Sequence, residues 1–244
     1  MTATHDSPRT ALLLVGSPKP GSSTSRSLGD HLLGLLAKRG MATEAVSLSQ
    51  ALRSAETIDA LCASVDAADI VVLSFPVYVD SLPAVVTGAL EVIARRRATR
   101  AGELQIESAP AFVAICQSGF PEQSHSSVSL RICRHFTQAA GFEWAGGLAM
   151  GGGGMIGGRP LAELGGQVRH QARALELTAE ALLDEGQVPD EAVVSMGKLP
   201  IPGFVYRKMG DMGWRGQAKA SGARARLAAQ PFPERQGEAP VVSR

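Results

Sequence analysis

Hydrophobic positions along the chain fall into short unbroken runs separated by stretches of helical spacing. The runs Ala11–Val15, Asp69–Ser74 and Ala111–Cys116 are continuous, as expected of parallel strands that are buried on both faces. Ala42–Leu48 alternates like a more exposed strand, and another strand is predicted within Glu143–Met150. The pattern therefore predicts five strands.

Apolar residues at helical spacing lie between these runs. Leucines within residues 28–36 predict a helix that Gly40 ends. Pro83 is expected at the first position of a second helix, because proline suits that position. Further helices are predicted over about 126–140 and 164–182, and two glycines weaken the start of the last one.

The alternation of strands and helices predicts a doubly wound α/β fold. Such a fold has a parallel sheet with helices on both faces, and five strands suit the flavodoxin-like order 2-1-3-4-5. We expect a mobile N-terminus over residues 1–9 and the folded domain over 10–186. A proline-rich C-terminal extension covers 187–244, and its end, 230–244, is expected to be mobile.

Composition narrows the possible partners and metals. The formal net charge is +1, so global charge predicts no nucleic-acid partner. The three cysteines show no CxxC spacing, so no metal or iron–sulfur site is predicted. A sparse, odd set of cysteines suits a reducing cytoplasm, and the apolar run after the polar start is too short for a signal peptide. We therefore expect a cytoplasmic protein.

The segment after the first strand, GSPKPGSSTS over residues 16–25, has the features of a phosphate-binding loop. Backbone N–H groups at the start of the following helix attract an anion, and the serine and threonine hydroxyls add donors. Ser22 and Ser23 stand where a Walker loop has its lysine and hydroxyl pair, so a bound monophosphate fits better than a nucleoside triphosphate. The alternative is a serine-rich turn in which Ser23 or Thr24 caps the helix.

A second segment, residues 76–83 (PVYVDSLP), follows the third strand directly. In the order 2-1-3 the first and third strands flank the switch point where ligands of open α/β sheets bind. Tyr78 there offers an aromatic face to a flat ring. The alternative is an ordinary loop with a packed tyrosine. Both segments together, in this chain order, favour a shared binding crevice.

These two segments resemble those of a known family. GSPKPGSSTS is similar to the GSPRxGGNTS-type loop of flavodoxin-like NAD(P)H-dependent FMN oxidoreductases, and FPVYVDSLPAVV is similar to their PVYWxSxP segment. The resemblance covers residues 10–185 in organisation and is sharp in these two loops. The sequence departs from the pattern at Ser23, where the family has asparagine, and at Val79, where it has an aromatic residue.

The resemblance implies FMN as the cofactor, NADPH or NADH as the co-substrate, and a set of contact residues. The phosphate contacts that it implies are Ser17, Lys19, Ser23, Thr24 and Ser25. The contacts to the flavin ring that it implies are Pro76, Val77, Tyr78 and Val79. It also implies a third cofactor loop after the fourth strand, where Gln117, Ser118 and Gly119 meet the pyrimidine end of the ring. For this third segment the alternative is a plain surface loop.

Residues 152–157 match the pattern GxGxxG, after a strand and before a helix. A dinucleotide fingerprint would need a new strand ending in an acidic residue about 20 residues further on, and none follows. A flexible glycine loop beside the substrate is the preferred interpretation. No catalytic residue is assigned, and the histidines receive no chemical role.

The function that the family resemblance implies is that of an FMN-dependent oxidoreductase. Hydride would pass from NAD(P)H through FMN to a small acceptor such as a quinone, an azo or nitro compound, or a free flavin. The protein is expected to be a homodimer. The alternatives are an FMN-binding electron carrier or redox sensor without turnover, and a flavodoxin-like interaction module that has lost FMN.

The C-terminal extension is locally basic. Residues 198–226 contain seven lysines and arginines and one acid, Asp211, and several aromatic and methionine residues lie among them. Such a mixture suits a membrane-surface helix, but Gly210, Gly213 and Gly216 each make a helix costlier by about 1 kcal/mol than alanine. A membrane partner is therefore disfavoured. We expect an arm that packs on the domain or across a dimer, with its cations near the flavin edge.

Overall fold

The computed structural model of the chain describes residues 9–19, 21–100, 109–184, 186–199 and 201–229. Segments 1–8 and 230–244, for which mobility is predicted, lie outside the described residues. The chain divides into two units, Met1–Gly203 and Phe204–Arg244, and each is described by itself.

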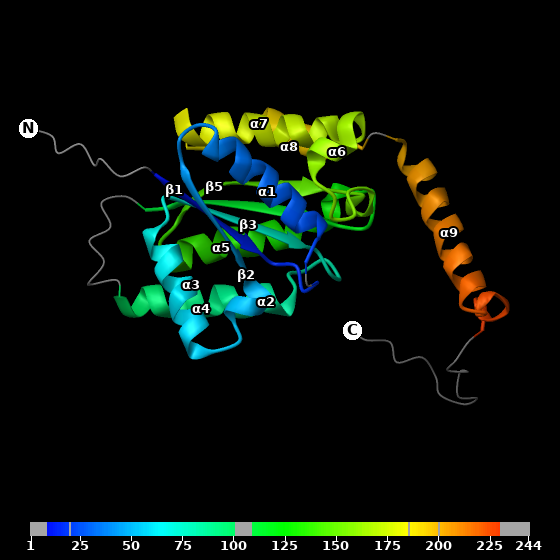
Figure 1. Cartoon of the computed structure of the whole chain (residues 1–244), viewed down its shortest axis with the longest axis horizontal. Coiled ribbons are helices and arrows are strands. Elements are labelled where there is room, and N and C mark those ends of the chain that lie inside the picture. The colour runs from blue at the N-terminus through cyan, green and yellow to red at the C-terminus, as the bar shows by residue number, and fades with distance from the viewer. Residues whose placement is uncertain (1–8, 20, 101–108, 185, 200, 230–244) are drawn as a thin grey trace, which may run out of the picture. The chain divides into compact units, whose positions relative to one another are not determined.

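The first unit is built on a parallel sheet with the strand order β2-β1-β3-β4-β5 (Figure 1). Its strands are β1 (Thr10–Val15), β2 (Ala42–Ser47), β3 (Ile70–Pro76), β4 (Ala111–Gln117) and β5 (Glu143–Met150). Every pair of neighbours is parallel. The predicted flavodoxin-like order is therefore confirmed.

The unbroken apolar runs of the central strands follow from burial on both faces of the sheet. In β1 the side chains of Leu12 and Leu14 enter the hydrophobic cluster on one face, while Leu13 and Val15 enter the cluster on the other face. All residues of β3 are buried. β2 forms one edge of the sheet and its first four residues are exposed, which explains its weaker pattern.

Helices cover both faces of the sheet (Figure 1). One hydrophobic cluster joins the sheet to α1, α6, α7 and α8, and the other joins it to α2, α3, α4 and α5. The α-helices of the described residues are α1 (Thr24–Ala37), α2 (Leu48–Ala51), α3 (Ala55–Ala67), α4 (Ala84–Arg100), α5 (Ser127–Ala140), α6 (Leu161–Leu164), α7 (Arg169–Asp184), α8 (Asp190–Met196) and α9 (Gly203–Ala220). Short 3₁₀ turns are η1 (Gln123–Ser126), η2 (Gly153–Met155), η3 (Gly165–Val168) and η4 (Arg224–Arg226).

The helix predictions differ from the structure in two places between Leu48 and Ala84. α2 and α3 were not predicted, although Ser54 and Thr57 form a reciprocal capping box at the start of α3. Pro83 lies one residue before α4 rather than inside it, and its carbonyl accepts the N–H groups of Val86 and Thr87. The glycine pair weakens the last predicted helix as expected, because it falls in the 3₁₀ turn η3 between α6 and α7.

The first unit continues beyond Gly186, where the alternation of strands and helices ends. The Val188 N–H donates to the Ala145 carbonyl at 2.7 Å. In α8, Ala192 and Met196 are fully buried in the cluster shared with α1 and α7. The segment up to α8 is thus packed as part of the domain core.

The second unit contains α9, which corrects one expectation. The glycines Gly210, Gly213 and Gly216 lie inside a continuous helix, although their helix cost argued against one. Its large apolar side chains Phe204, Met209, Met212 and Trp214 are exposed. No helix among the described residues is long and apolar enough to span a bilayer.

Candidate functional site

A cavity of about 380 Å³ lies at the carboxyl edge of the sheet, where the loops after β1, β3, β4 and β5 converge. Its volume falls in the range of about 300–1,000 Å³ that is typical of small-molecule sites. The topology explains the position, because β1 and β3 flank the switch point of the sheet. The cavity is lined by Ser17, Lys19, Ser22, Ser23, Thr24, Pro76, Val77, Tyr78, Gln117, Gly119, Gly153, Gly154 and Gly157.

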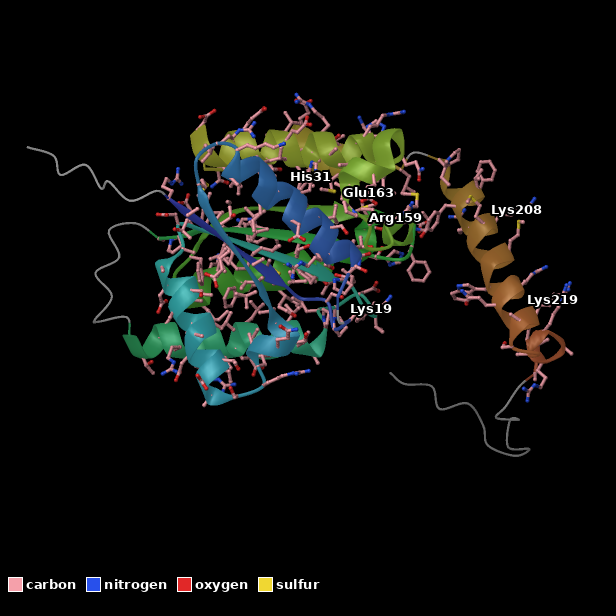
Figure 2. All side chains as sticks on the ribbon, in the orientation of Figure 1. Lys19, His31, Arg159, Glu163, Lys208 and Lys219 are labelled. Carbon is pink, nitrogen blue, oxygen red and sulfur yellow. The ribbon has the colours of Figure 1, made fainter. Side chains whose placement is uncertain are left out.

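The loop after β1 places hydroxyl groups, one cation and a helix N-terminus at one end of this cavity. Ser23 is the N-cap of α1, and its hydroxyl accepts the Arg26 N–H at 3.1 Å. Helix geometry leaves the other N–H groups of the first turn without intrahelical acceptors, and the helix dipole favours an anion there. Lys19 stands on the same loop, as Figure 2 shows. This end of the cavity is therefore suited to a phosphate group.

Thr24, the first residue of α1, makes a contact that the sequence did not predict. Its hydroxyl donates to the Gly153 carbonyl at 2.9 Å, across 129 positions of the chain. The side chain is largely buried at 9% exposure and lines the cavity. The hydrogen bond therefore ties the phosphate-binding loop to the glycine loop after β5.

The turn after β3 forms another wall of the cavity and is strained. Tyr78 and Ser81 exchange two backbone hydrogen bonds of 3.0 and 3.1 Å. Between them Val79 and Asp80 adopt left-handed conformations, with φ of +51° and +56°. This region costs a non-glycine residue about 1–2 kcal/mol, and it is rare for a β-branched valine. Such strain persists only where the surroundings hold it, as at ligand sites.

The loop after β4 and the glycine loop close the cavity on its remaining side. Gln117 and Gly119 line the cavity, and the Ser118 hydroxyl donates to the Phe120 carbonyl at 3.1 Å. The Gly153 N–H donates to the Ser118 carbonyl at 2.8 Å. A Cβ atom at Gly153 would overlap the side-chain amide of Gln117, so a larger residue there would displace the Gln117 side chain from its place in the cavity lining.

The structure brings most of the residues predicted for cofactor binding to this one cavity. Nine of them line it: Ser17, Lys19, Ser23, Thr24, Pro76, Val77, Tyr78, Gln117 and Gly119. Ser25 and Ser118 lie behind the lining, with exposures of 1% and 4%, and Val79 points outward at 99%. Ser22 and the glycines of the loop after β5 were not among the predicted contacts. The GxGxxG pattern was the available signal for those glycines.

Neither cysteine near this edge is a candidate nucleophile. Burial raises the pKa of the Cys116 thiol, on β4, to about 12, although a hydrogen bond with Ser126 opposes this shift. Burial also raises the pKa of the Cys133 thiol, on α5. Both groups therefore stay protonated at neutral pH and lack the thiolate that nucleophilic chemistry needs. The described residues contain no cluster of three or more metal-ligating side chains.

The residues present fit FMN. The cavity offers hydroxyls, Lys19 and the α1 N-terminus at one end, and the apolar and aromatic surface of Pro76, Val77 and Tyr78 at another. A monophosphate suits the first set and a flat ring suits the second. FMN combines these two groups in one molecule. The third loop adds the amide of Gln117, which can hydrogen-bond to a ring heteroatom.

Comparison with known proteins agrees with this assignment. The sequence profile of the family described as NADPH-dependent FMN reductase matches residues 10–139. A comparison with curated protein sequences found no match.

Three solved structures share the fold at low sequence identity. A flavone reductase has a TM-score of 0.52 and 13% identity, with 90% of this chain and 96% of that chain covered. An apo NADH:FMN oxidoreductase has a TM-score of 0.50 and 15% identity, covering 69% and 89%. An FMN-dependent NADH-azoreductase from Bacillus anthracis str. Ames Ancestor, in complex with FMN, has a TM-score of 0.50 and 13% identity, covering 72% and 100%.

The profile match extends from β1 to α5 and so includes the two segments that are predicted to contact the phosphate and the ring. FMN as cofactor and NAD(P)H as co-substrate follow from it, as does activity as a flavin oxidoreductase. Because the match covers more than half of the 244 residues, the chain belongs to the NADPH-dependent FMN reductase family.

Proposed function

We propose that this protein passes electrons from NAD(P)H through bound FMN to a small, flat acceptor such as a quinone, an azo compound, a nitro compound or a free flavin. The observation that carries the proposal is a cavity at the switch point that combines the hydroxyls, Lys19 and the α1 N-terminus with the apolar and aromatic surface of residues 76–78. When bound, FMN supplies the hydride and electron chemistry. The protein supplies binding, orientation and a defined approach for the second substrate.

The phosphate end is assigned to the loop after β1. We propose that Ser17, Lys19 and Ser23, together with the N–H groups at the start of α1, hold the FMN phosphate. Ser25 supports this loop from behind, since its carbonyl accepts the Ser74 hydroxyl at 2.7 Å. Thr24 holds the glycine loop in register with the phosphate-binding loop.

The ring end is assigned to the loops after β3 and β4. We propose that Pro76, Val77 and Tyr78 contact the isoalloxazine ring, and that Gln117 and the Gly119 backbone meet its pyrimidine end. Ser118 then fixes the loop through Phe120 rather than touching the ring. Val79 is 99% exposed and does not line the cavity, so we propose that it shapes the turn after β3 and makes no contact with the ring.

The experiment is a cofactor and turnover assay on the purified full chain. We expect a yellow protein that releases FMN on heating, and whose flavin absorbance bleaches faster with anaerobic NADPH or NADH than that of free FMN. A colourless protein that takes up no added FMN would refute the proposal. If neither NADPH nor NADH reduces the bound FMN faster than free FMN, the result would instead support an electron carrier or redox sensor.

The assembly and the C-terminal unit form a second part of the proposal. We propose a cytoplasmic homodimer, supported by the three buried cysteines, which form no disulfide among the described residues, and by the exposed apolar residues of α9. Figure 2 shows Lys208 and Lys219 extending from α9, and we propose that such cations help to hold the nicotinamide nucleotide.

A truncation tests the role of this unit. The cut belongs after Pro202, because a cut before α8 would remove the buried Ala192 and Met196 from the core. The shortened protein is expected to keep FMN while its dimer weakens or its KM for the nucleotide rises. Unchanged oligomeric state and kinetics would leave the C-terminal unit without a part in either.

A further inference from the structure

The strained turn after β3 is connected to the loop after β4 by a pair of side chains outside the cavity. Nδ1 of His125, in η1, lies 3.1 Å from Oδ1 of Asp80. The Ser129 hydroxyl, on α5, donates to the Asp80 carbonyl at 3.5 Å. Asp80 is one of the two left-handed residues of the turn, so these contacts hold the turn at the residue that carries the strain.

His125 also contacts the aromatic ring of Phe120. The two ring centroids are 5.2 Å apart, at an interplanar angle of 38°. Phe120 follows Gly119, which lines the cavity, and its carbonyl accepts the N–H of Gly152 at 2.7 Å. The backbone of Phe120 is therefore fixed between two walls of the cavity, and its ring is fixed from the outside by His125.

These residues carry an apolar rim beside the cavity. Tyr78, Val79 and Phe120 have exposures of 47%, 99% and 64%. The contacts Asp80–His125 and His125–Phe120 join the two loops on which these three side chains stand. Exposed apolar side chains gathered beside a binding cavity are typical of a surface that receives an apolar partner or ligand.

We infer that Phe120 is a specificity-determining residue for the electron acceptor, and that His125 and Asp80 are positioning residues that hold its ring at the cavity rim. The inference rests on the proposed function, whose acceptor approaches the flavin from outside the cavity. A planar, uncharged acceptor gains contact with the Phe120 ring, since aromatic pairs are attractive in offset or tilted geometry. A small, highly charged acceptor gains nothing from that ring.

The test compares two acceptors on the FMN-loaded full chain: menadione, which is flat and apolar, and ferricyanide, which is small and highly anionic. For Phe120→Ala we expect the KM for menadione to rise by about 2- to 10-fold, the change that corresponds to one aromatic contact. The kcat/KM for ferricyanide and the dissociation constant of FMN should stay at their wild-type values. Val194→Ala, which shortens an exposed apolar side chain on α8, is the matched control and should change neither acceptor.

The positioning role has its own variants. His125→Leu removes the polar contact to Asp80 and should raise the menadione KM as Phe120→Ala does. His125→Asn keeps a polar group close to the place of Nδ1 but not the ring that contacts Phe120, so it should restore part of the wild-type value. Direct titration of the oxidised protein with menadione by calorimetry gives a binding constant without turnover, and it should weaken in parallel with the KM.

The outcomes separate this inference from the proposed function. If wild type reduces both acceptors while Phe120→Ala changes neither, or changes both equally, the inference alone is overturned. An equal effect of His125→Leu and His125→Asn overturns the positioning role. A wild-type protein that reduces neither acceptor with NADPH or NADH overturns the proposed function and this inference with it.

Discussion

The hydroxyl of Thr24 has one proton, and the structure shows where that proton goes. It is donated to the Gly153 carbonyl at 2.9 Å, from a side chain that is 9% exposed. A hydroxyl cannot donate the same proton to a phosphate oxygen at the same time. Thr24→Val, which keeps the shape and removes the hydroxyl, therefore tests whether this group serves the loop, the phosphate or both.

The expected size of the effect follows from the contact. Removing the donor leaves the Gly153 carbonyl with the Ile156 N–H, at 3.2 Å, as its remaining partner, so the loss is that of one hydrogen bond, about 0.5–1.5 kcal/mol. We expect the free energy of unfolding of the apoprotein to fall by about that amount. Since Gly153 and Gly154 line the cavity, the loosened glycine loop should also weaken FMN binding. If the Thr24 hydroxyl instead donated to the phosphate, its removal would lower FMN affinity by roughly 10- to 100-fold. The apoprotein would then stay as stable as before.

The assay combines urea unfolding of the apoprotein, followed by circular dichroism, with FMN titration followed by flavin fluorescence. Thr24→Ser keeps the hydroxyl and should stay close to wild type in both. Thr178→Val is the matched control: its buried hydroxyl donates to the Ala174 carbonyl within α7, away from the cavity lining, so FMN affinity should not change. Apoprotein of wild-type stability with much weaker FMN binding would refute the reasoning from Gly153.

Three further predictions concern charge and burial. Lys19→Met should weaken FMN binding at low salt and less so at high salt, because salt screens the attraction between an exposed ammonium group and the phosphate. Isothermal titration measures the FMN affinity, and Lys38→Met, at the end of α1, is the control that should leave it unchanged. Arg97→Met should lower the urea-derived free energy of unfolding by about 3–5 kcal/mol, since it leaves the nearly buried Asp66, 2.8 Å from the guanidinium, without that partner. Burial raises the pKa of the Cys116 thiol to about 12, so the native state keeps a proton that the unfolded chain loses near pH 9. The urea midpoint of unfolding should therefore fall as the pH rises from about 9 to 12. The fall should be smaller in Cys116→Ala.

The sheet could be predicted because its pattern has few competing explanations. Unbroken apolar runs of β-branched and aliphatic residues in β1, β3 and β4 are what burial on both faces requires, and the rule for parallel crossovers then limits the strand order. α3 has a weaker signal, because only Leu61, Cys62 and Val65 are buried along its length. Its capping box uses Thr57 in place of the usual glutamate or glutamine.

The candidate site was predictable where it depends on position in the topology. Loops that follow neighbouring parallel strands must meet at one edge of the sheet, so the residues of three loops could be grouped without coordinates. The contacts Thr24–Gly153 and Asp80–His125 span 129 and 45 positions of the chain, and no local spacing indicates them. The left-handed turn at Val79 was equally hidden, since valine is disfavoured there.

α9 shows why a propensity argument failed. Three interior glycines lower the stability of a helix, but propensity is a weak prior that neighbouring residues override. The ends of α9 carry the usual signals instead: Pro202 directly precedes it, and Gly222, just past its end, has a φ of +67°. Apart from the neighbouring residues and the backbone of the helix itself, no heavy atom of the described residues lies within 4 Å of a Cβ built at Gly210, Gly213 or Gly216, so no close contact from elsewhere in the described residues requires glycine there. The residues at the two ends of α9 therefore indicated the helix better than the residues inside it. Proline before the start and glycine past the end predict a helix even where interior glycines disfavour one.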